Sequence, residues 1–153
     1  EFIMNIKQKE VLLKGINATR IAQRKGGGGR SLSYLEAWDV KAHLIRIFGF
    51  GGFSSEVLTS ELVFEEKMEK NWSVGYKVEL RLHIKELDAT YTEAAVGSAM
   101  LPQRGEAHDM AVKTAESDAL KRAAINLGDQ FGLSLYKNGQ TAPVVMETLA
   151  DNE

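Results

Sequence analysis

The chain has 153 residues, of which 44% are apolar, with 19 Lys and Arg against 21 Asp and Glu. This length suits one domain of ordinary size and argues against two compact domains. The chain contains no Cys, which excludes a disulfide framework, thiolate zinc sites and a thiol nucleophile, and favours a reducing, intracellular setting. Averaged over the whole chain, the net charge of −2 argues against binding of a polyanion.

The chain lacks a run of apolar residues long enough to cross a membrane and has no signal segment behind a basic start. We therefore expect a soluble, cytoplasmic protein that has no membrane partner. The three residues before Met4 resemble a cloning-site remnant. Residues 4–139 are expected to form the functional domain, and residues 140–153 a loose acidic tail.

The positive charge is concentrated near the N-terminus. Residues 4–30 contain seven Lys and Arg against Glu10, a local charge of +6, which leaves −8 for the rest of the chain. Val11, Leu12 and Ile16 with their neighbouring lysines predict a short helix. Four consecutive glycines, residues 26–29, then predict a loop whose backbone can approach a partner closely.

Residues 33–48 predict a helix that is buried around most of its girth. Ser33 and Glu36 have the spacing of a capping box, which predicts Ser33 as the N-cap. Trp38 and Phe48 are expected in the core. The remaining face of this helix carries polar residues, which are Asp39, His43 and Arg46.

Three strands and a long helix are expected next. Residues 53–64 predict a strand, 74–84 alternate apolar and polar side chains as a half-buried strand does, and 90–100 predict a third strand. Short connections favour an antiparallel meander. Residues 106–132 predict a helix with a small-residue stripe through Val112, Ala115, Ala119, Ala123, Leu127 and Phe131. The expected fold class is α+β.

Motifs for catalysis are weak. We expect His43, His83 and His108 to be solvated or locally satisfied, and the Glu65-Glu66 pair to lie in a charged turn. GGGGRS lacks the Walker lysine spacing, and no GxSxG elbow or HxxxH pair occurs. The sequence therefore predicts neither an enzyme nor a cofactor or metal site.

Cationic features offer the stronger candidates. Lys113, Lys121 and Arg122 share one region of the last helix and suit a phosphate backbone. The glycine loop adds a second group of cations, which are Arg24, Lys25 and Arg30. Tyr34 follows this loop and is placed to stack on a base. A solvated helix face is an equally good interpretation of the helix cations. Lys77, Arg81 and Lys85 form another row, for which solvation is the better interpretation.

Several short motifs together carry a family resemblance. They occur in order over about residues 20–136 and are Tyr34-Leu35-Glu36, Phe48-Gly49-Phe50-Gly51-Gly52-Phe53, Val74-Gly75-Tyr76, and Asp118-Ala119-Leu120-Lys121-Arg122-Ala123 with Gly128 and Phe131-Gly132. This combination resembles the DNA-binding domain of the Rad52 family of single-strand annealing proteins. The resemblance implies a ring or helical homo-oligomer with single-stranded DNA in a basic groove.

Carried over residue by residue, the resemblance implies an inner groove that contains Arg24, Tyr34, Lys113, Lys121 and Arg122. A further groove arginine of the family corresponds to Ile125 here, which removes one phosphate contact. For an outer site, the family lysines fall near Lys70 and Arg104. A single-strand-binding protein is a further partner that the resemblance suggests.

The leading hypothesis is ATP-independent annealing of complementary DNA strands in homologous recombination and double-strand break repair. The short chain suggests a bacterial or bacteriophage member. One alternative is a double-stranded-RNA-binding-like module, which has the same order of elements. Another is a self-assembling interaction protein that binds no nucleic acid, which the net charge of −2 favours.

Overall fold

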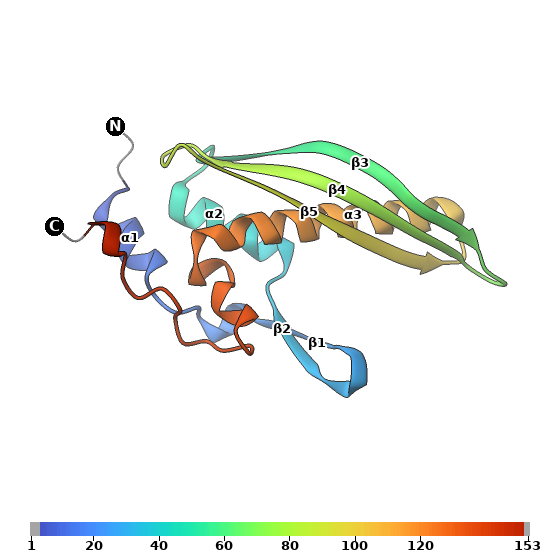
Figure 1. The fold of residues 1–153 in the computed structure, drawn as a ribbon, viewed down its shortest axis with the longest axis horizontal. Helices are drawn as coiled ribbons and strands as arrows, with labels where there is room; N and C mark the ends of the chain where they lie inside the picture. The colour runs from blue at the N-terminus through green and yellow to red at the C-terminus, as the bar shows by residue number, and fades with distance from the viewer. Residues whose placement is uncertain (1–3, 152–153) are drawn as a thin grey trace. The chain divides into compact units, whose positions relative to one another are not determined.

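The computed structural model describes residues 4–151 (Figure 1), so the expected cloning remnant lies outside the described residues. The chain divides into two compact units. The first unit comprises, in the described chain, residues 4–53, 84–88 and 124–151, and the second comprises residues 54–83 and 89–123.

The second unit is built on a three-stranded sheet. Its strands are β3 (Phe53–Lys67), β4 (Trp72–Ile84) and β5 (Ala89–Leu101), and β4 lies in the middle. Consecutive neighbours joined by short turns make an antiparallel meander, as predicted (Figure 1). Strand β3 runs to Lys67, so Glu65 and Glu66 lie on a strand and the prediction of a charged turn is wrong there.

Strand β4 has the predicted alternation. Val74, Val78, Leu80 and Leu82 are at most 2% exposed, whereas Lys77 and Arg81 between them are exposed. Strand β3 differs, because it lies at the sheet edge and is exposed along most of both faces. The central strand therefore supplies the sheet side of the core.

Helix α3 (Arg104–Ala124) covers the sheet (Figure 1). Its core stripe consists of five alanines at intervals of four residues, all fully buried: Ala107, Ala111, Ala115, Ala119 and Ala123. Three of these alanines, Ala115, Ala119 and Ala123, belong to the predicted stripe, whereas Val112 of that stripe is only partly buried. Small side chains let the helix backbone approach Gly97 on β5, where a Cβ atom would overlap the Ala111 carbonyl and the Ala115 amide.

Replacement of Gly97 with Ala is expected to destabilise the second unit. The added methyl meets helix backbone, which cannot move aside as a flexible side chain can, so we expect a loss of about 1–3 kcal/mol of unfolding free energy. Urea denaturation measures this loss. Gly105→Ala is the control, because nothing lies within 4 Å of its Cβ position and Ala favours helix. Equal stability of the two variants would contradict the close approach.

The first unit contains helix α1 (Ile6–Leu12), a hairpin of β1 (Ala22–Lys25) and β2 (Ser31–Tyr34), and helix α2 (Ala37–Phe48). Asn5 caps α1 through a reciprocal capping box with Gln8. Short 3₁₀ turns follow at Ile125–Leu127, Asp129–Phe131, Leu133–Tyr136 and Leu149–Asp151. Apolar side chains from these segments and from the connections between them fill its core, including Ile16, Leu35, Val40, Leu44, Phe48, Leu127 and Phe131.

The predicted start of the second helix is wrong. Ser33 lies on β2 opposite Gln23, and its hydroxyl accepts a hydrogen bond from the Gln23 amide at 2.9 Å. Glu36 is the N-cap of α2 and makes no side-chain capping bond. Pairing with β1 keeps residues 31–34 extended, because strand hydrogen bonds exclude the helical conformation that a capping box requires.

The predicted end of the last helix is also wrong. Helix α3 stops at Ala124, and the chain continues in 3₁₀ turns that are separated by Gly128 and Gly132, with φ of 98° and 96°. These left-handed angles favour glycine and cannot occur within an α-helix. Beyond them, buried Asp129 accepts hydrogen bonds from the amides of Val144 and Val145 at 3.0 and 2.9 Å. One carboxylate therefore attaches the C-terminal segment to the 3₁₀ turns of the same unit.

Candidate nucleic-acid interface

The glycine run forms the tip of the β1–β2 hairpin. The two strands pair from Ala22 opposite Tyr34 to Lys25 opposite Ser31, and the Gly26 amide donates to the Arg30 carbonyl at 2.6 Å. Gly28 and Gly29 have positive φ of 74° and 77°, which a tight turn of this shape requires. The glycines therefore close a hairpin and present the cations on both sides of its tip.

Three exposed cations surround this tip, namely Arg24, Lys25 and Arg30. Within residues 4–151, none of the three forms an ion pair with a carboxylate, and residues 22–34 contain no Asp or Glu. The Arg24 guanidinium lies 5.4 Å from the centre of the half-buried Tyr34 ring. The structure thus brings four predicted site residues together on one hairpin of the first unit.

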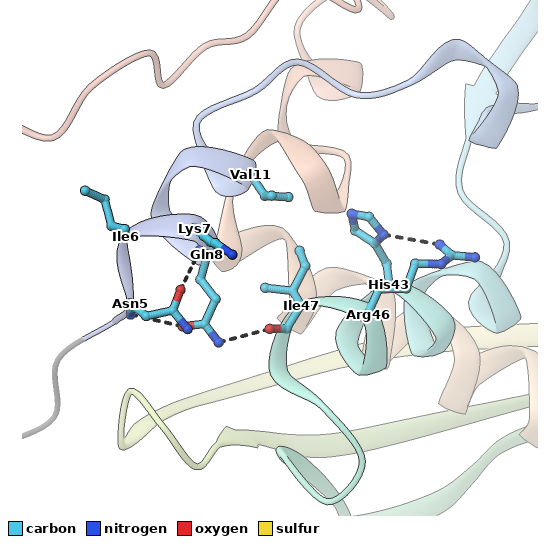
Figure 2. A pocket seen from close by; sticks show the side chains of 8 residues that line it. All are labelled: Asn5, Ile6, Lys7, Gln8, Val11, His43, Arg46 and Ile47. Atoms are coloured by element: carbon cyan, nitrogen blue, oxygen red, sulfur yellow. Dashed lines mark hydrogen bonds between the residues drawn. The ribbon is translucent and has the colours of Figure 1, made fainter.

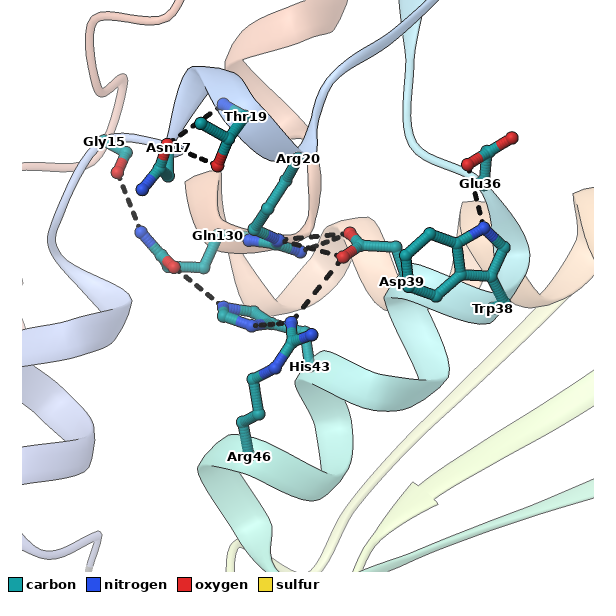
Figure 3. Close-up of polar contacts among 10 residues, drawn as sticks. All are labelled: Gly15, Asn17, Thr19, Arg20, Glu36, Trp38, Asp39, His43, Arg46 and Gln130. Carbon is teal, nitrogen blue, oxygen red and sulfur yellow. Dashed lines mark hydrogen bonds and ion pairs between the residues drawn. The ribbon is translucent and has the colours of Figure 1, made fainter.

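A buried ionic network holds the chain directly before this hairpin (Figure 3). Arg20 Nε and Nη2 donate to Asp39 Oδ2 at 3.1 and 2.9 Å, and Arg20 Nη1 donates to the Gln130 carbonyl at 2.8 Å. The side chains of Arg20 and Asp39 are only 11% and 4% exposed. Arg46 adds a second cation 3.6 Å from Asp39. The hairpin therefore starts two residues after a fixed anchor.

His43 continues the network with a defined tautomer (Figure 3). Its Nδ1 lies 3.2 Å from Arg46 Nη1, and since a guanidinium can only donate, Nδ1 accepts and Nε2 carries the proton. Nε2 then donates to Gln130 Oε1 at 2.8 Å, while Gln130 Nε2 donates to the Gly15 carbonyl at 2.8 Å. The three predicted polar residues of α2 do share one face, but Asp39 and His43 are buried.

Burial lowers the pKa of His43; the Gln130 hydrogen bond opposes this effect, and the charges of Arg20 and Arg46 add to it. The unfolded chain therefore takes up a proton at His43 near pH 6.5, before the folded chain does. We expect His43 to make the unfolding free energy decline as pH falls below about 6.5, until the folded His43 also protonates. Urea midpoints at about pH 7, 6 and 5 measure this. In His43→Gln the unfolding free energy should decline less over this pH range. An equal decline in the variant and the unsubstituted protein would contradict the assignment of the pH dependence to His43.

The predicted cations of α3 lie in the second unit and are paired with carboxylates. Lys113 Nζ lies 2.8 Å from Asp109, Lys121 Nζ 3.3 Å from Asp118, and Arg122 Nη2 3.3 Å from Glu93 on β5. Surface pairs of this kind contribute little to stability, so a phosphate can replace the carboxylate at small cost. Their charges are thus more fully compensated than those of the hairpin.

The candidate outer-site residues, Lys70 and Arg104, also belong to the second unit. Lys70 is exposed in the β3–β4 turn. Arg104 donates from Nε and Nη2 to Glu65 at 3.0 and 3.1 Å, and its guanidinium lies 5.1 Å from the Trp72 ring centre. Hydrogen bonds from His108 and Arg104 lower the pKa of the Glu65 carboxyl. Arg104 is therefore already held by an anion and an aromatic ring.

A pocket of about 570 Å³ lies in the first unit between α1 and α2 (Figure 2). Gln8 Nε2 donates across it to the Ile47 carbonyl at 3.0 Å, and the side chains of His43 and Arg46 at its edge are hydrogen-bonded to each other.

Among residues 4–151 no group of three His, Asp or Glu is placed to hold a metal ion. No helix in this described part is long and apolar enough to cross a membrane.

Two features of the site were missed by sequence reasoning. Trp38 was expected in the core, yet its side chain is 64% exposed and its Nε1 donates to Glu36 at 2.8 Å. Arg20 was counted only as one of the N-terminal cations, yet it is the buried partner of Asp39. Hydrophobic periodicity predicts neither the exposure of Trp38 nor the burial of Arg20, because it identifies one face of a helix and not the residues that pack against that face.

Nearly the whole chain matches one family model, which describes the Rad52/22 family double-strand break repair protein and covers residues 5–152. The chain belongs to the Rad52/22 family. This membership confirms the resemblance that the motifs carry. It agrees with the observed arrangement of a three-stranded sheet, a long helix against it and a shorter helix before it.

Relatives of this Rad52/22 family chain include recombination proteins of fungi. It is 34% identical over 134 residues to DNA repair and recombination protein rti1 of Schizosaccharomyces pombe, covering 85% of this chain and 35% of the relative. It is 33% identical over 129 residues to rad22 of the same yeast, covering 82% of this chain and 27% of the relative. It is 30% identical over 125 residues to RAD52 of Saccharomyces cerevisiae, covering 80% of this chain and 26% of the relative. The matches thus span about a quarter to a third of these relatives. Because these relatives are fungal, they do not support the expected bacterial or bacteriophage source.

Proposed function

We propose that this chain binds single-stranded DNA and promotes ATP-independent annealing of complementary strands during recombination and double-strand break repair. The observation that carries the proposal is the β1–β2 hairpin, which exposes Arg24, Lys25 and Arg30 beside Tyr34 with no carboxylate among residues 22–34. Fungal relatives that act in DNA repair and recombination support it. Annealing breaks no covalent bond and requires no acid, base or nucleophile.

The chemistry of the hairpin suits a flexible single strand. Arginine and lysine bind phosphates without reading sequence, while an aromatic ring can stack on any base. The exposed glycine backbone at Gly27–Gly29 offers amides to phosphate oxygens where a side chain would block approach. We therefore expect strong salt dependence and little sequence preference. Lys70 and Arg104 are proposed as a second, weaker contact, because Arg104 must first leave Glu65.

Lys121 and Arg122 are proposed as phosphate contacts of the second unit. Replacing both with Ala is expected to weaken strand binding several-fold, because each charge-assisted bond to a phosphate replaces a weak carboxylate pair and its net gain is reduced by that small cost. Fluorescence anisotropy of a labelled oligonucleotide measures the effect. Unchanged affinity would remove these two residues from the interface.

Self-association is part of the proposal, since one hairpin supplies few phosphate contacts and many copies on one strand multiply them. Edge strand β3 supports this view. Its exposed apolar side chains are Val57, Leu62, Val63 and Phe64, at 40% to 53% exposure, on both faces of the strand. An exposed apolar edge is suited to pair with another chain. A ring or helical homo-oligomer, and contact with a single-strand-binding protein, are the expected assemblies.

Gel shifts with single-stranded DNA, duplex DNA and duplex RNA, together with light scattering and a strand-annealing assay without ATP, test the function. We expect preference for single-stranded DNA, an oligomer, and faster annealing than the uncatalysed reaction. Preference for duplex RNA would favour a double-stranded-RNA-binding module instead. An oligomer without affinity for any nucleic acid would favour an interaction protein, and a monomer without strand affinity would contradict the proposal.

A further inference from the structure

Trp38 lies at the start of helix α2 with most of its indole open to solvent. Its side chain is 64% exposed, whereas the neighbouring Leu35 and Val40 are at most 5% exposed. Its Nε1 donates to Glu36 Oε2 at 2.8 Å (Figure 3), so the pyrrole edge is held, while most of the residue remains exposed. A large, exposed, oriented aromatic side chain needs an explanation that core packing does not supply.

The surroundings of Trp38 favour an anionic, base-bearing partner over an apolar one. Lys41 is exposed one helical turn later on the same side of α2, and within residues 4–151 it forms no ion pair. Of the two carboxylates near Trp38 in the sequence, Asp39 is buried and paired with Arg20, whereas exposed Glu36 accepts the indole hydrogen bond at the ring edge. An aromatic ring beside a free cation is the combination that single-stranded nucleic acid uses, with stacking for the base and charge for the phosphate.

Trp38 is also close along the chain to the proposed strand-binding hairpin. It follows Tyr34 by four positions, which limits the distance between their Cα atoms to about 14 Å. A single-strand-binding module typically covers several nucleotides, so one bound strand is long enough to span this distance. One strand bound at Arg24 and Tyr34 can therefore continue to Trp38 within the same unit.

We infer that Trp38 is a base-stacking residue that extends the single-stranded DNA site from the hairpin onto the exposed start of helix α2, with Lys41 as its phosphate contact. The inference rests on the proposed function and adds a residue that is outside the motifs named in the sequence analysis. The face of the Trp38 ring would stack on one base, while the hydrogen bond from Nε1 to Glu36 holds the ring at its edge.

Tryptophan emission tests this directly, because the chain has only two Trp residues and Trp72→Phe leaves Trp38 as the single reporter. Oligo(dT) and an abasic oligomer with equal numbers of phosphates are titrated, and anisotropy of labelled strands measures binding independently. We expect oligo(dT) to quench Trp38 in step with binding, and the abasic oligomer to bind with much less quenching. Binding of oligo(dT) without quenching would overturn the inference but leave the proposed function intact.

Trp38→Ala supplies the second arm. Stacking of one base predicts about a fivefold to hundredfold loss of affinity for oligo(dT), with little change for the abasic oligomer. Tyr136→Ala is the matched control, an exposed aromatic residue of the same unit at 67% exposure, and should change neither affinity. Equal affinities of Trp38→Ala and the parent for oligo(dT), or an equal loss in Tyr136→Ala, would overturn the inference.

Two further outcomes separate the inference from its alternatives. If Trp38 emission shifts when DNA-free protein is diluted through its association range, the indole lies between copies of the chain, and the stacking role is wrong. If the Trp72→Phe parent and the unsubstituted protein both bind no strand, the proposed function fails together with the inference. Trp38→Phe, which keeps a ring, should retain part of the affinity that Trp38→Ala loses.

Discussion

Replacing Asp39 with Asn is expected to lower the unfolding free energy by about 3–5 kcal/mol, the usual cost of leaving a buried charge without its partner. Asp39 is 2% exposed and accepts three hydrogen bonds from Arg20. Asn keeps the shape of the side chain but removes its charge, so the Arg20 guanidinium stays buried without an anion. Urea denaturation followed by circular dichroism measures the loss.

Asp118→Asn is the control for this prediction. Asp118 also pairs with a cation, Lys121, but on the surface of α3, where such pairs contribute about 0–1 kcal/mol. If Asp39→Asn costs no more than Asp118→Asn, the buried network does not anchor the first unit. A variant that combines Arg20→Met with Asp39→Leu should recover part of the loss, because apolar residues of similar size avoid the desolvation of both charges.

The second large effect concerns the hairpin cations. Arg24→Ala, Lys25→Ala and Arg30→Ala combined should weaken single-stranded DNA binding by about tenfold for each phosphate that the variant no longer binds, since a hydrogen bond to a charged group contributes about 1.5 kcal/mol or more. Annealing should slow in parallel. Stability should change little, because the three side chains are exposed and make no ion pair within residues 4–151. Anisotropy and a strand-annealing assay measure the two effects.

A charge-matched variant distinguishes position from total charge. Lys77→Ala, Lys85→Ala and Lys137→Ala remove three positive charges from other exposed positions. The two triple variants then have the same net charge. Only the hairpin variant should lose strand binding, and a similar loss in both would mean that general electrostatic attraction, and not the hairpin, holds the strand.

The sheet could be predicted from the sequence because its central strand has a strong pattern of period two. Val78, Leu80, Leu82 and Ile84 are buried at every second position of β4, a set that an α-helix would spread around its circumference. The alanine spacing of α3 was equally informative, since alanine at intervals of four residues indicates a close helix contact. These features depend on local periodicity, which the chain itself carries.

The boundaries and the site depended on contacts that periodicity does not encode. Ser33 was predicted to cap a helix, but strand pairing with Gln23 prevents this. Helix α3 ends at Ala124, and the positive φ angles of Gly128 and Gly132 prevent the helix from continuing along the predicted apolar stripe. The burial of Asp39 required knowledge that Arg20 lies beside it, which depends on the folded chain. These boundaries and contacts depend on the three-dimensional arrangement of the chain, which periodicity in a single sequence does not show.

The whole-chain charge of −2 is a poor guide to the interface, because the hairpin residues 22–34 carry +3 with no carboxylate. We propose that this hairpin is the principal phosphate-binding element. The salt dependence of oligo(dT) affinity tests it most directly, because removing three phosphate-binding cations should reduce the slope of log K against log salt by about 2 for each bound subunit on a single strand. We predict this reduction for the Arg24, Lys25 and Arg30 triple variant. An unchanged slope, with the parent and the variant equally sensitive to salt, would show that the hairpin cations are not the principal phosphate contacts.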